Sequence, residues 1–109
     1  MKRGDVVIAT GPGFGKKPRP FVGMQAHAYA RLPTLILLPI SSELADPPSR
    51  LRVPLKPGEA NGLRKKCEVS AELPVTVRID RVHQHIGQLD SEDLLRVEQA
   101  LGLVLGFAG

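Results

Sequence analysis

The 109-residue sequence has few of the residues that build disulfide frameworks, metal clusters and aromatic platforms. Its single cysteine, Cys67, excludes an internal disulfide and a cysteine-based zinc cluster. Tryptophan is absent and aromatic residues make up 4% of the chain, so stacking on nucleobases must be sparse. No apolar run approaches the roughly 20 residues that a membrane-spanning helix needs. The N-terminal segment has no signal-peptide cleavage pattern, and the sequence therefore predicts a cytoplasmic protein with no membrane segment.

Complete cofactor and metal signatures are also lacking. Residues 11–16, Gly-Pro-Gly-Phe-Gly-Lys, are rich in glycine but lack the spacing and the Lys-Ser/Thr ending of a phosphate-binding loop. His83 and His85 could line one face of a strand, but a third metal ligand is missing beside them. The sequence therefore predicts neither a bound metal nor a cofactor.

Acidic residues are scarce in the first 66 residues. This part carries twelve lysine and arginine residues against four acidic ones, a charge of +8, whereas residues 67–109 carry three against seven, a charge of −4. A basic body followed by an acidic segment favours a polyanionic partner. Nucleic acid is the obvious candidate, although many small basic proteins bind nothing specific.

The most informative stretch that is present is residues 16–25, Lys-Lys-Pro-Arg-Pro-Phe-Val-Gly-Met-Gln. The two prolines fix their own backbone and favour extended neighbours, so Arg19 is presented on a stiff segment. A guanidinium held in this way suits a phosphate, because its planar fork donates two parallel hydrogen bonds. Ser41 and Ser42 follow an apolar run, at a strand end where a sheet presents polar groups to a groove. A solvated basic turn at Arg19 and simple turn chemistry at the two serines remain alternatives.

The spacing of apolar residues predicts short strands followed by one helix. The run 35–40 is expected to be a strand buried on both faces, and Cys67, which alternates with Val69, is expected to pack inward. This pattern predicts a small β-barrel or sandwich. The expected strands are residues 6–9, 21–25, 35–40, 51–55, 67–72 and 75–79.

The last element has the helical period. Asp90 is the expected N-cap, and Gly106 is placed to end the helix. The packed face of this helix is expected to hold Leu94, Val97, Leu101, Val104 and Leu105.

A series of short motifs runs along the chain in a particular order. The motifs are Lys2-Arg3-Gly4-Asp5-Val6-Val7, Lys17-Pro18-Arg19-Pro20-Phe21-Val22, Leu38-Pro39-Ile40-Ser41-Ser42, Asn61-Gly62-Leu63-Arg64, Cys67-Glu68-Val69, Ile86-Gly87-Gln88-Leu89-Asp90 and Leu103-Val104-Leu105-Gly106. In this order and spacing, the sequence resembles the MazF/PemK-type toxins of bacterial type II toxin–antitoxin systems.

The resemblance implies a mainly β fold, an SH3-like small β-barrel with a C-terminal α-helix, in a single domain over residues 1–109. It implies a homodimer that a cognate antitoxin protein neutralises. It also implies metal-independent, sequence-specific cleavage of single-stranded mRNA. One alternative is a toxin of the same fold that inhibits a protein target such as DNA gyrase without cleaving RNA. Another is an RNA-binding module without catalysis.

The resemblance also implies site residues. The arginine of the Arg-Pro motif and the residue after the third strand carry catalysis in this family, which points to Arg19 and Ser41. Arg19 would stabilise the phosphorane and Ser41 would donate a hydrogen bond to a phosphate oxygen. Glu72 is a candidate general base. Contacts to the RNA are expected from Lys16, Lys17, Ser42, Arg64, Lys65, Lys66 and Ser70.

Overall fold

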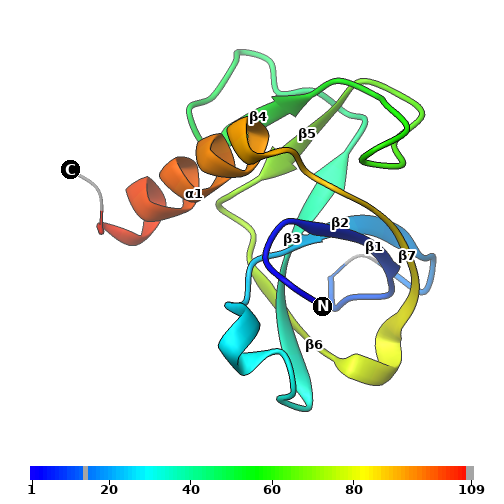
Figure 1. Cartoon of the computed structure of the whole chain (residues 1–109). Coiled ribbons are helices and arrows are strands. Elements are labelled where there is room, and N and C mark those ends of the chain that lie inside the picture. The colour runs from blue at the N-terminus through cyan, green and yellow to red at the C-terminus, as the bar shows by residue number, and fades with distance from the viewer. Residues whose placement is uncertain (14, 108–109) are drawn as a thin grey trace.

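The computed structural model describes residues 1–13 and 15–107. Its organising element is the long strand β3 (Thr34–Ser41), which changes partner along its length. The first half of β3 pairs with β6, its last residues pair with β5, and β2 runs along its other side. All pairings are antiparallel, and the sheet order is β4-β5-β3-β2-β1-β7 (Figure 1). The other strands are β1 (Asp5–Ala9), β2 (Arg19–Gly23), β4 (Arg52–Leu55), β5 (Cys67–Ser70), β6 (Val75–Arg78) and β7 (Val82–Gln88).

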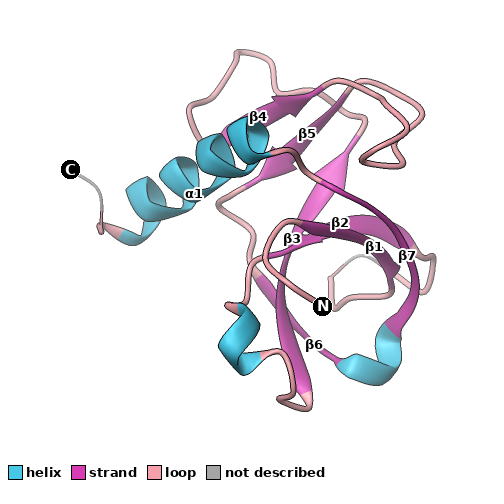
Figure 2. Ribbon diagram, viewed as in Figure 1, coloured by secondary structure: helices cyan, strands magenta, loops and turns pink. Residues whose placement is uncertain are grey.

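The predicted class, mainly β with one C-terminal helix, is confirmed (Figure 2). The sheet curls strongly but does not close into a ring, because no pairing within the described residues joins β4 to β7. The physical reason is the divided edge of β3. Since β6 pairs with the first half of that edge and β5 with the last residues, the strands separate into two groups that share only β3.

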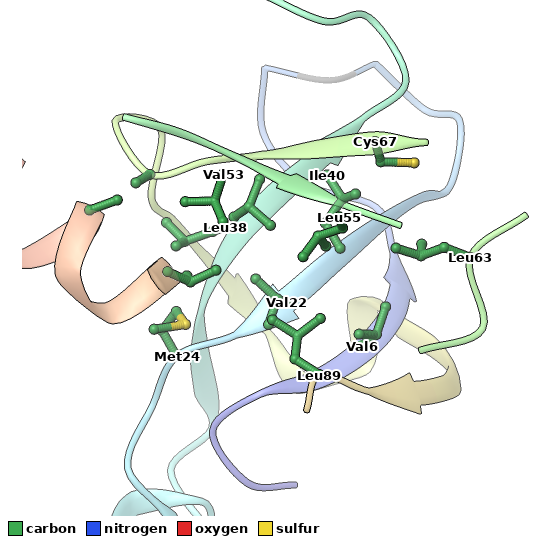
Figure 3. Packing of buried hydrophobic residues seen from close by; sticks show 14 residues of the cluster. Val6, Val22, Met24, Leu38, Ile40, Val53, Leu55, Leu63, Cys67 and Leu89 are labelled. Carbon is green, nitrogen blue, oxygen red and sulfur yellow. The ribbon is translucent and has the colours of Figure 1, made fainter. Parts of the chain in front are cut away.

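The core lies on both faces of the sheet. Successive side chains of a strand point to opposite faces, so Val22 and Leu38 join one cluster while Phe21 and Leu37 join the other. The larger cluster is enclosed by β4, β5 and the helix (Figure 3). It includes Cys67, which is buried as predicted.

The helix α1 (Ser91–Leu105) begins and ends where the sequence predicts. The Asp90 side chain accepts a hydrogen bond from the Asp93 amide at 2.7 Å, and Gly106 adopts the left-handed conformation that ends the helix, with φ of 80°. Val97 is fully buried. Val104 and Leu105 were predicted on the packed face but are exposed, because the second half of α1 extends beyond the body (Figure 1). None of the helices in the described residues is long and apolar enough to cross a membrane.

Several strand predictions need correction, and β7 (Val82–Gln88) was not among the expected strands. The second strand runs from Arg19 to Gly23 rather than over 21–25, and Ile36 in β3 is exposed although the run 35–40 was predicted to be buried on both faces. The strand expected over residues 67–72 ends at Ser70, and all four residues of β5 are buried, so neither of its faces is exposed to solvent. Glu68 accepts a hydrogen bond from the Ala45 amide at 2.7 Å, because the connection after β3 folds back over β5.

Candidate active site

The edge of the sheet at which β2 begins and β3 ends carries the candidate site. Arg19 is the first residue of β2 and Ser41 the last residue of β3. The two strands are antiparallel, and their pairing ends with Phe21 opposite Pro39, two residues short of Arg19 and of Ser41. β5 begins at the same edge, with Glu68 paired to Ser41. Two residues separated by 22 positions in the sequence are therefore brought to one place by strand pairing alone.

A cavity of about 660 Å³ opens at this edge, and we call it the Arg19 cavity. It contains five of the residues that the sequence predicted for the site, together with an apolar wall and the polar side chains of Glu43 and Gln84. The predicted residues that line it are Arg19, Ser41, Ser42, Arg64 and Lys65. The apolar wall is made of Ile8, Ile40, Leu63 and Ile86.

The loop before β5 is held over the cavity by Gly62. This residue has φ of +72°, and a Cβ placed on it would lie 2.3 Å from the carbonyl oxygen of Ile86 in β7. Only glycine can adopt that conformation at such a close approach to another backbone. Asn61 supports the same turn, because its side chain accepts a hydrogen bond from the Leu63 amide at 2.9 Å. The turn therefore positions Arg64 and Lys65 at the cavity.

A smaller cavity of about 240 Å³ adjoins the Arg19 cavity. Arg19, Ser41 and Glu43 line both cavities, and Ser70 and Arg52 line the smaller one. Arg19 and Ser41 thus lie where the two cavities meet. The predicted contribution of Ser70 falls on the smaller cavity.

Arg19 has its guanidinium available for a ligand. The side chain is exposed, and among the described residues it has no hydrogen-bond or ion-pair partner. The Ser41 hydroxyl accepts a hydrogen bond from the Glu43 amide at 3.0 Å. Because that bond uses a lone pair of the oxygen, the hydroxyl proton remains free to be donated to a ligand. The two side chains can therefore supply donors to one anionic group.

Glu72, the predicted base, lies outside the lining of both cavities. The Nε of Arg52 donates to both of its carboxylate oxygens, at 3.0 and 2.9 Å. The carboxylate that does line both cavities is Glu43, which the sequence reasoning did not select. Its position two residues after Ser41, in the turn that closes the strand, was the available signal.

The remaining predicted contacts are dispersed. Lys16 lines a different cavity beside β6, and Lys66 lines one near the start of α1. Lys17 is exposed and outside the two cavities at the Arg19 edge. Cys67 lines the Arg19 cavity with a thiol that donates to the Lys65 carbonyl at 3.1 Å. Burial raises the pKa of this thiol, and the nearby Lys65 charge lowers it by a smaller amount.

Ligands for a metal do not gather at this edge. Over residues 1–13 and 15–107, no group of three or more His, Cys, Asp or Glu side chains is arranged so that it could hold a metal ion. His83 and His85 lie on β7, as the sequence suggested, and both are exposed. His85 lies 3.5 Å from the buried carboxylate of Asp5.

Comparison with known proteins gives a consistent result. The model of the PemK-like, MazF-like toxins of type II toxin–antitoxin systems matches residues 2–105. A protein of Mycolicibacterium smegmatis named probable endoribonuclease MazF is 29% identical over 110 residues, which cover 100% of each chain.

Solved structures show the same fold at low sequence identity. An endoribonuclease in complex with its cognate antitoxin from a mycobacterial species has a TM-score of 0.84 at 15% identity, over 100% of this chain and 98% of that chain. The toxin MazF-mt6 of Mycobacterium tuberculosis has a TM-score of 0.79 at 20% identity, over 94% and 96%. A MazE–MazF structure from Deinococcus radiodurans has a TM-score of 0.78 at 19% identity, over 97% and 95%.

Proposed function

Because the chain belongs to the family of PemK-like, MazF-like toxins of type II toxin–antitoxin systems, we propose that it is an endoribonuclease that cleaves single-stranded mRNA at specific sequences without a metal ion. The observation that carries this proposal is the unpartnered guanidinium of Arg19 beside the Ser41 hydroxyl at one cavity. These are donors for a phosphodiester. The basic first 66 residues supply the long-range attraction for a polyanion.

The reaction that fits these groups is an internal transesterification. The ribose 2′-hydroxyl loses its proton to a base and attacks the adjacent phosphorus, while the bond from phosphorus to the 5′ oxygen breaks. The products are a 2′,3′-cyclic phosphate and a 5′-hydroxyl end, and the leaving oxygen takes a proton from an acid or from water. Arg19 stabilises the additional negative charge of the phosphorane, and Ser41 donates a hydrogen bond to a phosphate oxygen.

We place the general base at Glu43 rather than at Glu72. A base has to reach the proton that it removes, and Glu43 is the carboxylate that lines the cavity together with Arg19 and Ser41. Glu72 is instead held by Arg52, which itself lines the smaller cavity. Its role in this proposal is to orient Arg52.

The remaining parts of the function follow the family. Arg64 and Lys65, with Ser42, contact the RNA at the cavity rim, and Lys17 adds charge nearby. Residues 1–109 form one domain, and two copies of the chain form a homodimer in the cytoplasm. A cognate antitoxin neutralises this homodimer. The exposed apolar side chains at the end of α1 (Leu103, Val104, Leu105 and Phe107) are available for such protein contacts.

The test uses a long single-stranded RNA in the presence of EDTA. The wild-type protein is compared with Arg19→Ala and with Arg31→Ala, an exposed arginine that lines neither cavity. We expect wild type and Arg31→Ala to cut the same sites and leave 5′-hydroxyl ends. Arg19→Ala is expected to lower kcat about 10²- to 10³-fold, as the loss of one donor to a developing oxyanion does.

Three results would contradict the proposal. RNA that stays whole with the wild-type protein would favour the alternative, inhibition of a protein target such as DNA gyrase without RNA cleavage. Equal cutting by wild type and Arg19→Ala would show that the guanidinium is not part of the chemistry. Loss of binding without loss of turnover in Arg19→Ala would indicate a role in affinity only.

A further inference from the structure

Another cavity, which is lined by cations, lies beside the loop that connects β1 and β2. We call it the loop cavity; its volume is about 560 Å³, and the described residues of the loop that line it are 10–12, 15 and 16, facing the chain around β6. Its polar side chains are Lys16, Arg78, Arg81, Thr10 and Thr76. The described residues that line it include no acidic side chain.

The wall of the loop cavity is firmly attached at the start of the loop. The Thr10 amide donates to the Arg81 carbonyl at 3.1 Å, and the Thr10 hydroxyl lies 3.3 Å from Nε2 of His83. Gly11 packs on the core, since a Cβ there would lie 3.2 Å from the ring of Phe21. The hydroxyl and the guanidinium at residues 10 and 81 are therefore carried on backbone that is bonded together.

The charge of the loop cavity is only partly neutralised within the protein. Arg78 forms an exposed ion pair with Asp80 at 3.0 Å. Lys16 and Arg81, by contrast, have no side-chain hydrogen bond or ion pair to any described residue. The two cations without partners, Lys16 and Arg81, carry the same charge at one concave site, so an anion bound between them would be favoured. A phosphate fits these two cations and the two threonine hydroxyls, because each of the four groups can donate to its oxygens.

We propose that the loop cavity binds a backbone phosphate of the same RNA, a few nucleotides away from the bond that is cut. This inference rests on the proposed endoribonuclease function. Lys16 precedes Arg19 by three residues, so their backbones are at most about 10 Å apart. An RNA strand that leaves the Arg19 edge and crosses the loop reaches Lys16 and then Arg81. The described lining supplies cations and hydroxyls, which are donors for a phosphate.

The test measures binding separately from cleavage. A long single-stranded RNA with 2′-O-methyl groups at every position cannot be cut, because the attacking hydroxyl is blocked, and its dissociation constant is measured over a range of salt concentrations. The variant is Arg81→Ala and the matched control is Arg31→Ala, which removes the same charge from an exposed position outside the loop cavity. Arg81→Gln, which keeps most of the side-chain length, repeats the test if the alanine variant does not fold.

We expect Arg81→Ala to bind this RNA roughly tenfold more weakly than the control, as the loss of one charge-assisted contact to phosphate would do. The plot of log K against log salt should become shallower by about 0.7, the value for one phosphate contact to a single strand. Equal affinity and equal slope for Arg81→Ala and Arg31→Ala would overturn the inference.

The outcome for the loop cavity can be separated from the outcome for the proposed function. If wild-type protein does not cleave unmodified RNA in EDTA, the proposed function fails whatever Arg81 does. If it does cleave RNA and the Arg81 variants bind the methylated RNA like the control, only the loop cavity assignment fails.

Discussion

The assignment of the general base makes a sharp prediction, because two carboxylates differ in their surroundings. Glu43 lines both cavities at the Arg19 edge, and its side chain is exposed. Glu72 is half-buried and accepts two hydrogen bonds from Arg52. The matched substitutions Glu43→Gln and Glu72→Gln each replace a carboxylate by an amide of the same shape. They therefore change charge and proton affinity with little change in packing.

We expect Glu43→Gln to lower activity and leave stability unchanged, and Glu72→Gln to lower stability with little effect on activity. Removing a general base lowers kcat by about 10²- to 10⁴-fold, so Glu43→Gln should lose activity to this extent with a free energy of unfolding within about 0.5 kcal/mol of wild type. Glu72→Gln loses the charge of a partly buried ion pair, whose exposed fractions are 25% for Arg52 and 27% for Glu72. That loss should cost about 0.5–1.5 kcal/mol of stability, with a much smaller effect on kcat.

The assay combines single-turnover cleavage of a saturating RNA with urea unfolding of each variant. Saturation removes the contribution of RNA affinity, so the measured rate reports the chemical step. The reasoning would be refuted if Glu72→Gln lowered the rate about 100-fold or more while Glu43→Gln stayed near wild type. Wild-type rates in both variants would show that the base is neither carboxylate.

Two further predictions concern the cavity walls. Gly62→Ala should lower the free energy of unfolding by about 3 kcal/mol in urea unfolding, because its Cβ would clash with the Ile86 carbonyl at a positive φ; a change below about 0.5 kcal/mol would contradict the close approach. The Cys67 thiol, whose pKa burial raises, should react with iodoacetamide only at alkaline pH. The unfolded chain loses this proton at lower pH than the folded chain, so the contribution of Cys67 to stability is full below the ordinary thiol range and declines as pH rises through it. Rapid alkylation at neutral pH would contradict the burial of this thiol.

Much of the fold could be predicted from local patterns. The helix was located by its apolar period and by its caps at Asp90 and Gly106, which depend on residues within one or two turns. Strand positions came from alternation. The burial of both faces of β5 could not be predicted, because Glu68 is satisfied by the Ala45 amide 23 residues before it. The exposure of Val104 and Leu105 likewise depends on how far α1 extends past the sheet.

In the candidate site too, some residues could be predicted from the sequence and others could not. Arg19 and Ser41 were identified from sequence, and the register of β2 and β3 brings them together as that interpretation requires. Glu72 was selected from its place along the chain, but its pairing with Arg52 is a contact across β4 and β5. Lys16 was grouped with Arg19 because they are neighbours in sequence, whereas the turn of the loop places Lys16 in a separate cavity.

The amino-acid sequence by itself determined the helix and most of the strand segments, although not β7. It also determined the basic character of the first 66 residues and the stiff presentation of Arg19 between two prolines. Only the tertiary structure decided which carboxylate faces the cavity, which cations share a site and where the sheet stays open. The physical reason is range. Periodicity, caps and proline act over a few residues. The partner of each charged side chain is instead set by strand register and by the divided edge of β3, which bring together residues far apart in the chain.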